Sequence, residues 1–108
     1  MFVFISHLTV PAEDRDRLER HFQERSRLVD SFPGFRHLQL LAPRSGDSRF
    51  TFLTAWDSKD AFARYMRSVE HATSHSREPA SLVARAQVRH EAIDVLMDSR
   101  DEAACPRR

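Results

Sequence analysis

Residues 50–62 read FTFLTAWDSKDAF, and this stretch contains the clearest boundary between two elements in the chain. Aromatic and β-branched side chains dominate it as far as Trp56, which is typical of a β-strand. Ser58 then stands where the N-cap of a helix accepts a hydrogen bond from a backbone N–H group. We therefore predict a strand over residues 49–56 and a helix that starts just after Ser58.

Apolar side chains at helical spacing define the inward face of this helix, which we expect to end near Arg67. The inward positions are Ala61, Phe62, Tyr65 and Met66. A short helical segment is expected to follow over about residues 69–76. It carries His71 and His75, which lie one turn apart on the same face of a helix.

Three more strands and one more helix complete the pattern, with turn residues such as Pro11 and Gly34 marking their ends. The expected elements are a strand over 2–10, a helix from Ala12 to about Ser31, a strand over 35–41 and a last strand over 87–97, with residues 77–86 left unassigned. The order βαββαβ predicts an α+β fold of the ferredoxin-like type, a four-stranded antiparallel sheet with both helices on one face. We expect residues 1–97 to form one domain and residues 98–108 to be a charged, mobile tail.

The first strand is largely apolar on both faces. Alternation places Phe2, Phe4 and Ser6 on one face and Val3 and Ile5 on the other. A sheet with one solvated face would alternate apolar and polar residues more cleanly. We therefore expect the helices to cover one face and a second copy of the chain to cover the other, as a homodimer.

Composition excludes several classes of function. The 108 residues carry a formal charge of +1, which gives no general attraction to nucleic acid or membrane. No apolar run approaches the roughly 20 residues that span a bilayer. Cys105 is the only cysteine, so no disulfide can form within the chain, and we expect a cytoplasmic protein. The βαββαβ order also occurs in RNA-binding domains, but the glycine of their third-strand motif is missing after Arg49.

The histidines suggest a metal site without specifying one. His71 and His75 have H-x-x-x-H spacing, and Ala72 follows His71, so the H-E-x-x-H signature of zinc proteases is absent. A two-histidine site with a third ligand such as His90 remains open. So does the interpretation that His71 is a solvated helix residue.

Four other residues have both a structural and a functional interpretation. Phe22 lies on the apolar stripe of the first helix, as a core residue or as a ring that packs on a ligand. Arg25 shares that stripe, and its guanidinium needs either an acidic partner or a bound carboxylate. Tyr65 is a core tyrosine or part of a pocket wall. Ser6 is either a small packing residue or a hydroxyl donor that lines a pocket.

Two short signatures carry a resemblance to a known family: Phe32-Pro33-Gly34-Phe35 and the run from Trp56 to Phe62. They resemble those of the antibiotic-biosynthesis-monooxygenase (ABM) superfamily of dimeric α+β barrels, over nearly the whole chain from Phe2 to about Met97. Within it, the chain is most similar to the IsdG and MhuD type of haem-degrading monooxygenase. The closer match is carried by the length and order of the elements, by Phe22 and Arg25, and by His75 ten residues after Tyr65.

The resemblance implies a haem-binding monooxygenase that opens the haem ring with O2 and releases iron, haem being both cofactor and substrate. It implies that His75 is the axial ligand of the haem iron and that Phe22 and Arg25 hold the porphyrin. Ser6 and Tyr65 occupy the catalytic positions where the family has an asparagine and a tryptophan. An external electron donor is expected, because the chain has no flavin or iron–sulfur motif.

Two alternatives remain open. One is a cofactor-free ABM oxygenase acting on a quinol or polyphenol, with His37, His71 or His75 as the base that forms the substrate anion. The other is a non-catalytic haem-binding or merely dimeric barrel, which the changed residues Ser6 and Tyr65 keep possible.

Overall fold

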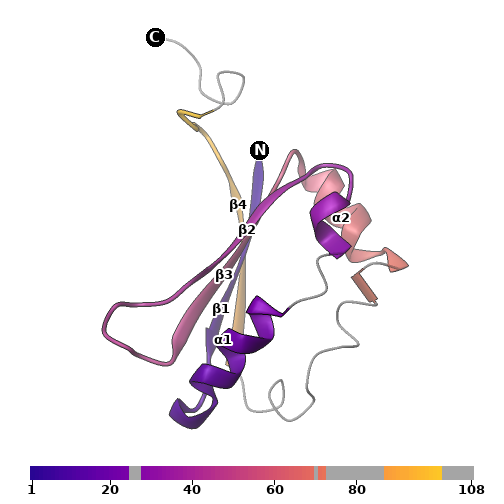
Figure 1. Cartoon of the computed structure of the whole chain (residues 1–108). Coiled ribbons are helices and arrows are strands. Elements are labelled where there is room, and N and C mark those ends of the chain that lie inside the picture. Colours follow the sequence, from indigo (N-terminus) through magenta and orange to yellow (C-terminus); the bar gives the residue numbers. More distant parts are fainter. Residues whose placement is uncertain (25–27, 70, 73–86, 101–108) are drawn as a thin grey trace.

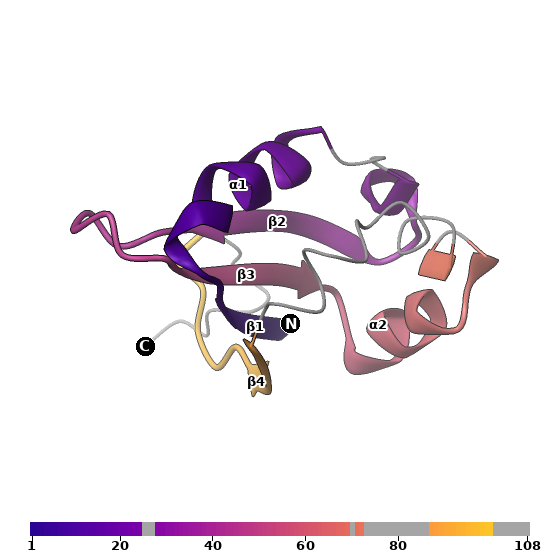
Figure 2. The same ribbon diagram turned by 90° about the horizontal axis from the view of Figure 1, so that it is seen from below.

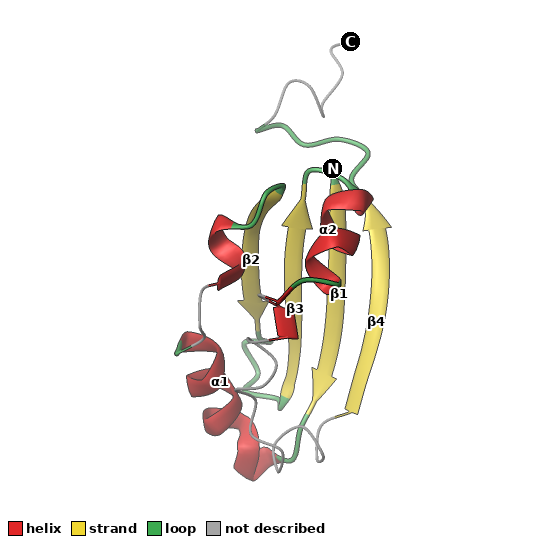
Figure 3. Cartoon of the chain, turned by 90° about the vertical axis from the view of Figure 1, so that its right-hand side faces the viewer, coloured by secondary structure: helices red, strands yellow, loops and turns green. Residues whose placement is uncertain are grey.

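The computed structural model describes residues 1–24, 28–69, 71–72 and 87–100 (Figure 1). Its four strands form one antiparallel sheet in the order β2-β3-β1-β4. The strands are β1 (Phe2–Thr9), β2 (Phe35–Leu41), β3 (Arg49–Trp56) and β4 (Gln87–Asp94), and the helices are α1 (Arg15–Gln23) and α2 (Lys59–Met66). Both helices lie on the same face of the sheet (Figures 1 and 3). The predicted α+β, ferredoxin-like arrangement is confirmed.

The first helix and the last strand differ from the prediction. The helix expected from Ala12 to about Ser31 is divided into a 3-10 turn, the nine-residue α1 and a second 3-10 turn over Leu28–Ser31. The last strand ends at Asp94 and not at Met97, because its partner β1 begins at Phe2 and the Val95 N–H bonds the Met1 carbonyl at 3.0 Å. Each boundary depends on a neighbouring segment, which local sequence does not report.

Helix α2 begins as predicted. The Ser58 hydroxyl accepts a hydrogen bond from the Ala61 N–H at 3.1 Å, so Ser58 is the N-cap. Ala61 and Tyr65, four residues apart, form the buried face of the helix. Met66, predicted to point inward, is 42% exposed, because it lies about 100° around the helix from Tyr65.

The core consists of two separate clusters at opposite ends of the sheet. Figure 2 shows α1 and α2 and the sheet they pack on from a second direction. The α2 cluster is built around Trp56, which is 1% exposed, and it also contains Phe2, Val29, Ala61 and Tyr65. The α1 cluster contains Val10, Leu18 and Phe50. Each helix therefore packs on its own end of the sheet.

The turn before β2 joins the α2 cluster through a contact that only glycine permits. Gly34 has φ +87°, a left-handed conformation that L side chains rarely adopt. A β-carbon at this position would lie 2.5 Å from the Cβ of Ala61. The Gly34 carbonyl also accepts a hydrogen bond from the Asp57 N–H at 2.8 Å. One glycine thus connects the start of β2, the end of β3 and the first turn of α2.

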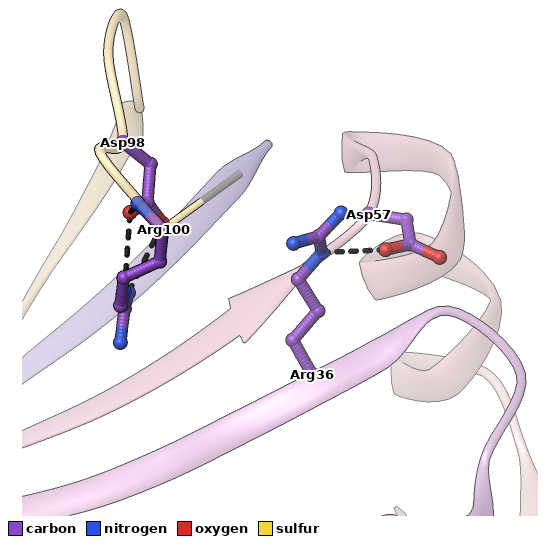
Figure 4. A network of polar contacts seen from close by, with 4 residues as sticks. All are labelled: Arg36, Asp57, Asp98 and Arg100. Carbon is purple, nitrogen blue, oxygen red and sulfur yellow. Dashed lines mark hydrogen bonds and ion pairs between the residues drawn. The ribbon is translucent and has the colours of Figure 1, made fainter. Parts of the chain in front are cut away.

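Two ion pairs lie near this end of the sheet (Figure 4). Arg36 on β2 bonds Asp57 through Nε at 2.6 Å. In the turn after β4, Nε and Nη2 of Arg100 each bond one carboxylate oxygen of Asp98 at 3.0 Å. The side-chain hydrogen bonds from Arg100 lower the pKa of Asp98 from 3.8 to about 2. The rest of the predicted tail, residues 101–108, lies outside the described residues.

Replacing Gly34 with alanine tests the close contact. Overpacking against Ala61 and the left-handed backbone together predict a loss of about 2–4 kcal/mol in the free energy of unfolding. Gly46 is the matched control, since it has φ +80° but no heavy atom within 4 Å of a β-carbon there. Gly46→Ala should cost only the backbone term of about 1 kcal/mol. Urea denaturation measures both, and equal losses in the two variants would contradict the packing argument.

Candidate functional site

A row of four side chains crosses the middle of the sheet on the face that carries the helices. The β-sheet register aligns them from the outer strand β4 through β1 and β3 to β2. They are His90, Ser6, Phe52 and Leu40. We call these four residues the central row.

The central row is less buried than the two ends of the same face. Phe2 and Trp56 at one end and Val10 and Phe50 at the other are 5% exposed or less. Ser6, Phe52 and Leu40 are only partly buried, and His90 is exposed. In a helix-covered sheet the middle is normally the driest part, whereas here α1 and α2 leave part of the central row accessible.

A hydrogen-bonded pair lies at the β4 side of this row. Ser6 Oγ and His90 Nδ1 are 2.9 Å apart, and the two residues are direct partners across β1 and β4. The His90 ring also stacks on Phe4, with centroids 5.2 Å apart and planes inclined by 27°. The imidazole is therefore positioned by a hydrogen bond with the Ser6 hydroxyl and by stacking on the Phe4 ring.

Aromatic rings flank the central row toward each helix. Phe22 of α1 lies 4.7 Å from the Phe52 ring, centroid to centroid. Phe62 of α2 stacks on Phe4 at 4.5 Å. All four rings are partly buried, so part of their surface remains accessible. Such flat apolar surfaces suit a planar aromatic ligand.

Tyr65 lies in the α2 cluster and not beside Ser6 in the central row. It is 8% exposed, and its ring packs against Phe32, Trp56 and His71 at centroid distances of 5.2, 5.3 and 5.2 Å. Two predicted site residues thus share Phe52 as a neighbour: Ser6 is its β-sheet partner, and Phe22 packs on its ring. The structure places Tyr65 in a separate wall of aromatic rings.

Two predicted site residues, His75 and Arg25, lie outside the described residues. His71 is described: its N–H bonds the Ser68 hydroxyl at 3.1 Å, and its ring contacts Tyr65. Within residues 1–24, 28–69, 71–72 and 87–100, no three His, Cys, Asp or Glu side chains are grouped to hold a metal ion. His90, considered from sequence as a third metal ligand, bonds Ser6.

The sequence carried one signal for the Ser6–His90 pair. Strand alternation puts His90 on the same face as Val88 and Ala92, and antiparallel pairing puts that face level with Ser6. That His90 is the partner of Ser6 follows only from the register between β1 and β4, because the two residues are 84 positions apart in the sequence.

The opposite face of the sheet has a different character. Its middle is apolar, with Val3 and Ala55 buried and Ile5, Leu53 and Ile93 partly buried.

Near the β2–β3 hairpin this face borders a hollow of ≈ 650 Å³. Half of its lining residues are polar, namely His7, Thr9, Arg49, Thr51, Gln87 and Arg89. These polar residues lie on the face of the sheet opposite the central row. His37, one of the candidate bases, also belongs to this opposite face through its pairing with Ala55.

No helix in the described part of the chain is long and apolar enough to cross a membrane.

Comparison with known sequences places the chain near oxygenases. The profile of a family described as antibiotic biosynthesis monooxygenase matches residues 1–77. Curated relatives from two strains of Mycobacterium tuberculosis, named haem oxygenase (mycobilin-producing), are 40% identical over 60 residues, which is 56% of this chain and 57% of theirs. The match thus spans little more than half the length of these relatives.

Solved structures extend the similarity over most of the chain. MhuD from Mycobacterium tuberculosis, described as a haem degrader with two haems bound in its active site, has a TM-score of 0.75 and 30% identity over 91% of this chain and 98% of that one. An MhuD variant with two manganese protoporphyrin IX per active site has the same TM-score at 28% identity, over 91% and 97%. SnoaB, a cofactor-independent oxygenase from Streptomyces nogalater, has a TM-score of 0.73 at 20% identity, over 93% and 97%, and shows the fold alone.

The Ser6–His90 hydrogen bond can be tested in the free protein. We expect the ¹⁵N resonance of His90 Nδ1 to move when Ser6→Ala removes the hydroxyl. His7 is the internal control, because its Nε2 contacts Glu91 at 3.3 Å on the opposite face and should keep its resonances. Long-range ¹H–¹⁵N spectra of the imidazoles report both residues at once. A His90 resonance that does not respond to Ser6→Ala would contradict the pairing.

Proposed function

The chain belongs to the antibiotic biosynthesis monooxygenase family, and from this premise we propose that it binds haem over the central row and opens the porphyrin ring with O2. Haem is the substrate as well as the group that activates oxygen, and ring opening releases its iron. The names of the mycobacterial relatives, a haem oxygenase and a haem degrader, support this choice among the activities of the family.

One observation carries the proposal: the middle of the helix-covered face is only partly buried. A 108-residue domain has little core to spare, so an open middle between two packed ends has a cost in stability. The exposed surfaces there are aromatic rings around a single polar pair, Ser6 and His90. A flat, largely apolar macrocycle with a reactive centre fits this chemistry.

The residues of the chain have distinct roles in the proposal. His75 would hold the haem iron through a neutral imidazole nitrogen. Arg25 pairs with a propionate, since a guanidinium binds carboxylates with two parallel hydrogen bonds. Phe22, already against Phe52, packs on the porphyrin. The Ser6 hydroxyl lies on the reacting side.

Tyr65 acts as part of a rigid wall. Its ring is fixed by Trp56 and Phe32, and Trp56 in turn contacts Phe62 at 5.7 Å. The Trp56 Nε1–H donates to Thr54 Oγ1 at 3.0 Å, which also fixes the indole. We propose that this wall presses on one side of the porphyrin and limits how it can rotate in the site.

Two partners complete the proposal. A second copy of the chain covers the opposite face, where the apolar centre of Val3, Ile5, Leu53, Ala55 and Ile93 is in register across three strands. A separate electron donor supplies the reducing equivalents, and the reaction takes place in the cytoplasm.

Titration with haemin tests the function and the ligand together. Wild-type protein is expected to form a tight complex with the absorbance spectrum of histidine-ligated haem. His75→Ala should weaken binding by at least tenfold, or about 1.4 kcal/mol, because the iron loses its protein ligand. His37→Ala, on the opposite face, should bind as the wild type does. Addition of reductant and O2 to the wild-type complex should bleach the haem band and yield a ring-opened product.

Each result that contradicts the proposal removes a different part of it. Unchanged binding in His75→Ala, with loss in His71→Ala, would move the ligand to the other histidine. Bound haem that survives reductant and O2 would leave a haem-binding protein without the reaction. Oxygen consumption with a quinol in the absence of haem would favour the cofactor-free alternative.

A further inference from the structure

His90 has no role in the site as deduced from sequence, yet the structure places it in the central row. It is the direct β-sheet partner of Ser6, and its Nδ1 lies 2.9 Å from Ser6 Oγ. Among the described residues, His90 is the only one whose side chain forms a hydrogen bond with the Ser6 hydroxyl. What the hydroxyl offers to a ligand therefore depends on His90.

The dependence follows from the count of protons. A serine hydroxyl has one proton and two lone pairs, and each imidazole nitrogen either carries a proton or accepts one. If His90 Nδ1 accepts the Ser6 proton, a ligand over the central row meets only oxygen lone pairs. If His90 Nδ1 carries a proton and donates a hydrogen bond to Ser6 Oγ, the Ser6 hydroxyl can in turn donate a hydrogen bond to the ligand. The state of one nitrogen thus sets the sense of the Ser6 hydrogen bond.

The surroundings hold the imidazole in place for this task. The His90 ring stacks on Phe4, and Phe4 stacks on Phe62 of α2. These two contacts link the position of the imidazole to that of α2. His90 is exposed, so water can reach the ring. The proton can therefore reside on Nδ1, toward Ser6, without leaving a buried nitrogen unpaired.

We propose that His90 is a positioning residue of the haem site, whose Nδ1–H holds the Ser6 hydroxyl with its proton directed at the ligand over the central row. This inference rests on the proposed function, because it requires haem at that place. It assigns to a residue of the outer strand β4 the orientation of the only hydroxyl in the central row.

Carbon monoxide bound to the reduced haem complex is a suitable probe. A hydrogen bond donated to its oxygen lowers the C–O stretching frequency, which infrared spectroscopy measures without any turnover. Ser6→Ala should raise the frequency. His90→Phe, which keeps a ring to stack on Phe4, should raise it toward the same value. The double variant should match Ser6→Ala alone, because His90 acts through Ser6. His90→Asn, whose amide can donate from the position of Nδ1, should retain the wild-type frequency.

His7→Phe is the matched control, since it is the next residue on β1 but its side chain lies on the opposite face beside Glu91. It should leave the frequency unchanged. Additive shifts in the double variant, or a wild-type frequency in His90→Phe beside a shifted Ser6→Ala, would overturn the role of His90 while leaving the haem proposal intact. A wild-type protein that forms no haem complex, seen in the absorbance spectrum before carbon monoxide is added, would overturn the proposed function and this inference with it.

Discussion

The contact of Gly34 with Ala61 is the constraint on which the rest of the arrangement depends. It brings the turn before β2 against the first turn of α2 at a distance that admits no side chain. The Asp57 N–H bond to the Gly34 carbonyl and the Ser58 cap then determine where α2 begins and in which direction it runs. This direction places Phe62 over Phe4 and Tyr65 against Trp56.

The open site is a consequence of this tight corner. Because α2 is held at one end of the sheet and α1 packs on the other, the helices cover the central row only in part: Phe22 of α1 contacts Phe52, while Ser6 is partly buried and His90 is exposed. A small domain would bury that row if packing alone decided the structure. The row carries the Ser6–His90 pair, and the aromatic rings around it are only partly buried. The physical cost of the opening is the reason to interpret it as a binding site.

Local patterns were sufficient for some parts of this structure and insufficient for others. The strands over 35–41 and 49–56 and the cap at Ser58 follow from alternation, turn residues and capping chemistry, and the structure confirms them. The end of β4 and the neighbour of His90 depend on pairing between distant segments, which a single sequence does not specify. The short α1 likewise escaped prediction, because the apolar spacing of Leu18 and Phe22 continues to Val29, which lies in a 3-10 turn. The roles of His75 and Arg25 rest on family resemblance and stay predictions, while Ser6 and Phe22 have gained a shared neighbour in Phe52.

A crystal structure of the haem complex tests the central claim most directly. The account predicts the porphyrin between α1 and α2, with one face toward Ser6 and Phe52 and the iron bound by His75. A porphyrin on the opposite face of the sheet, in the hollow lined by His7 and Arg49, would contradict it. So would a protein in which the middle of the helix-covered face closes over with its own side chains.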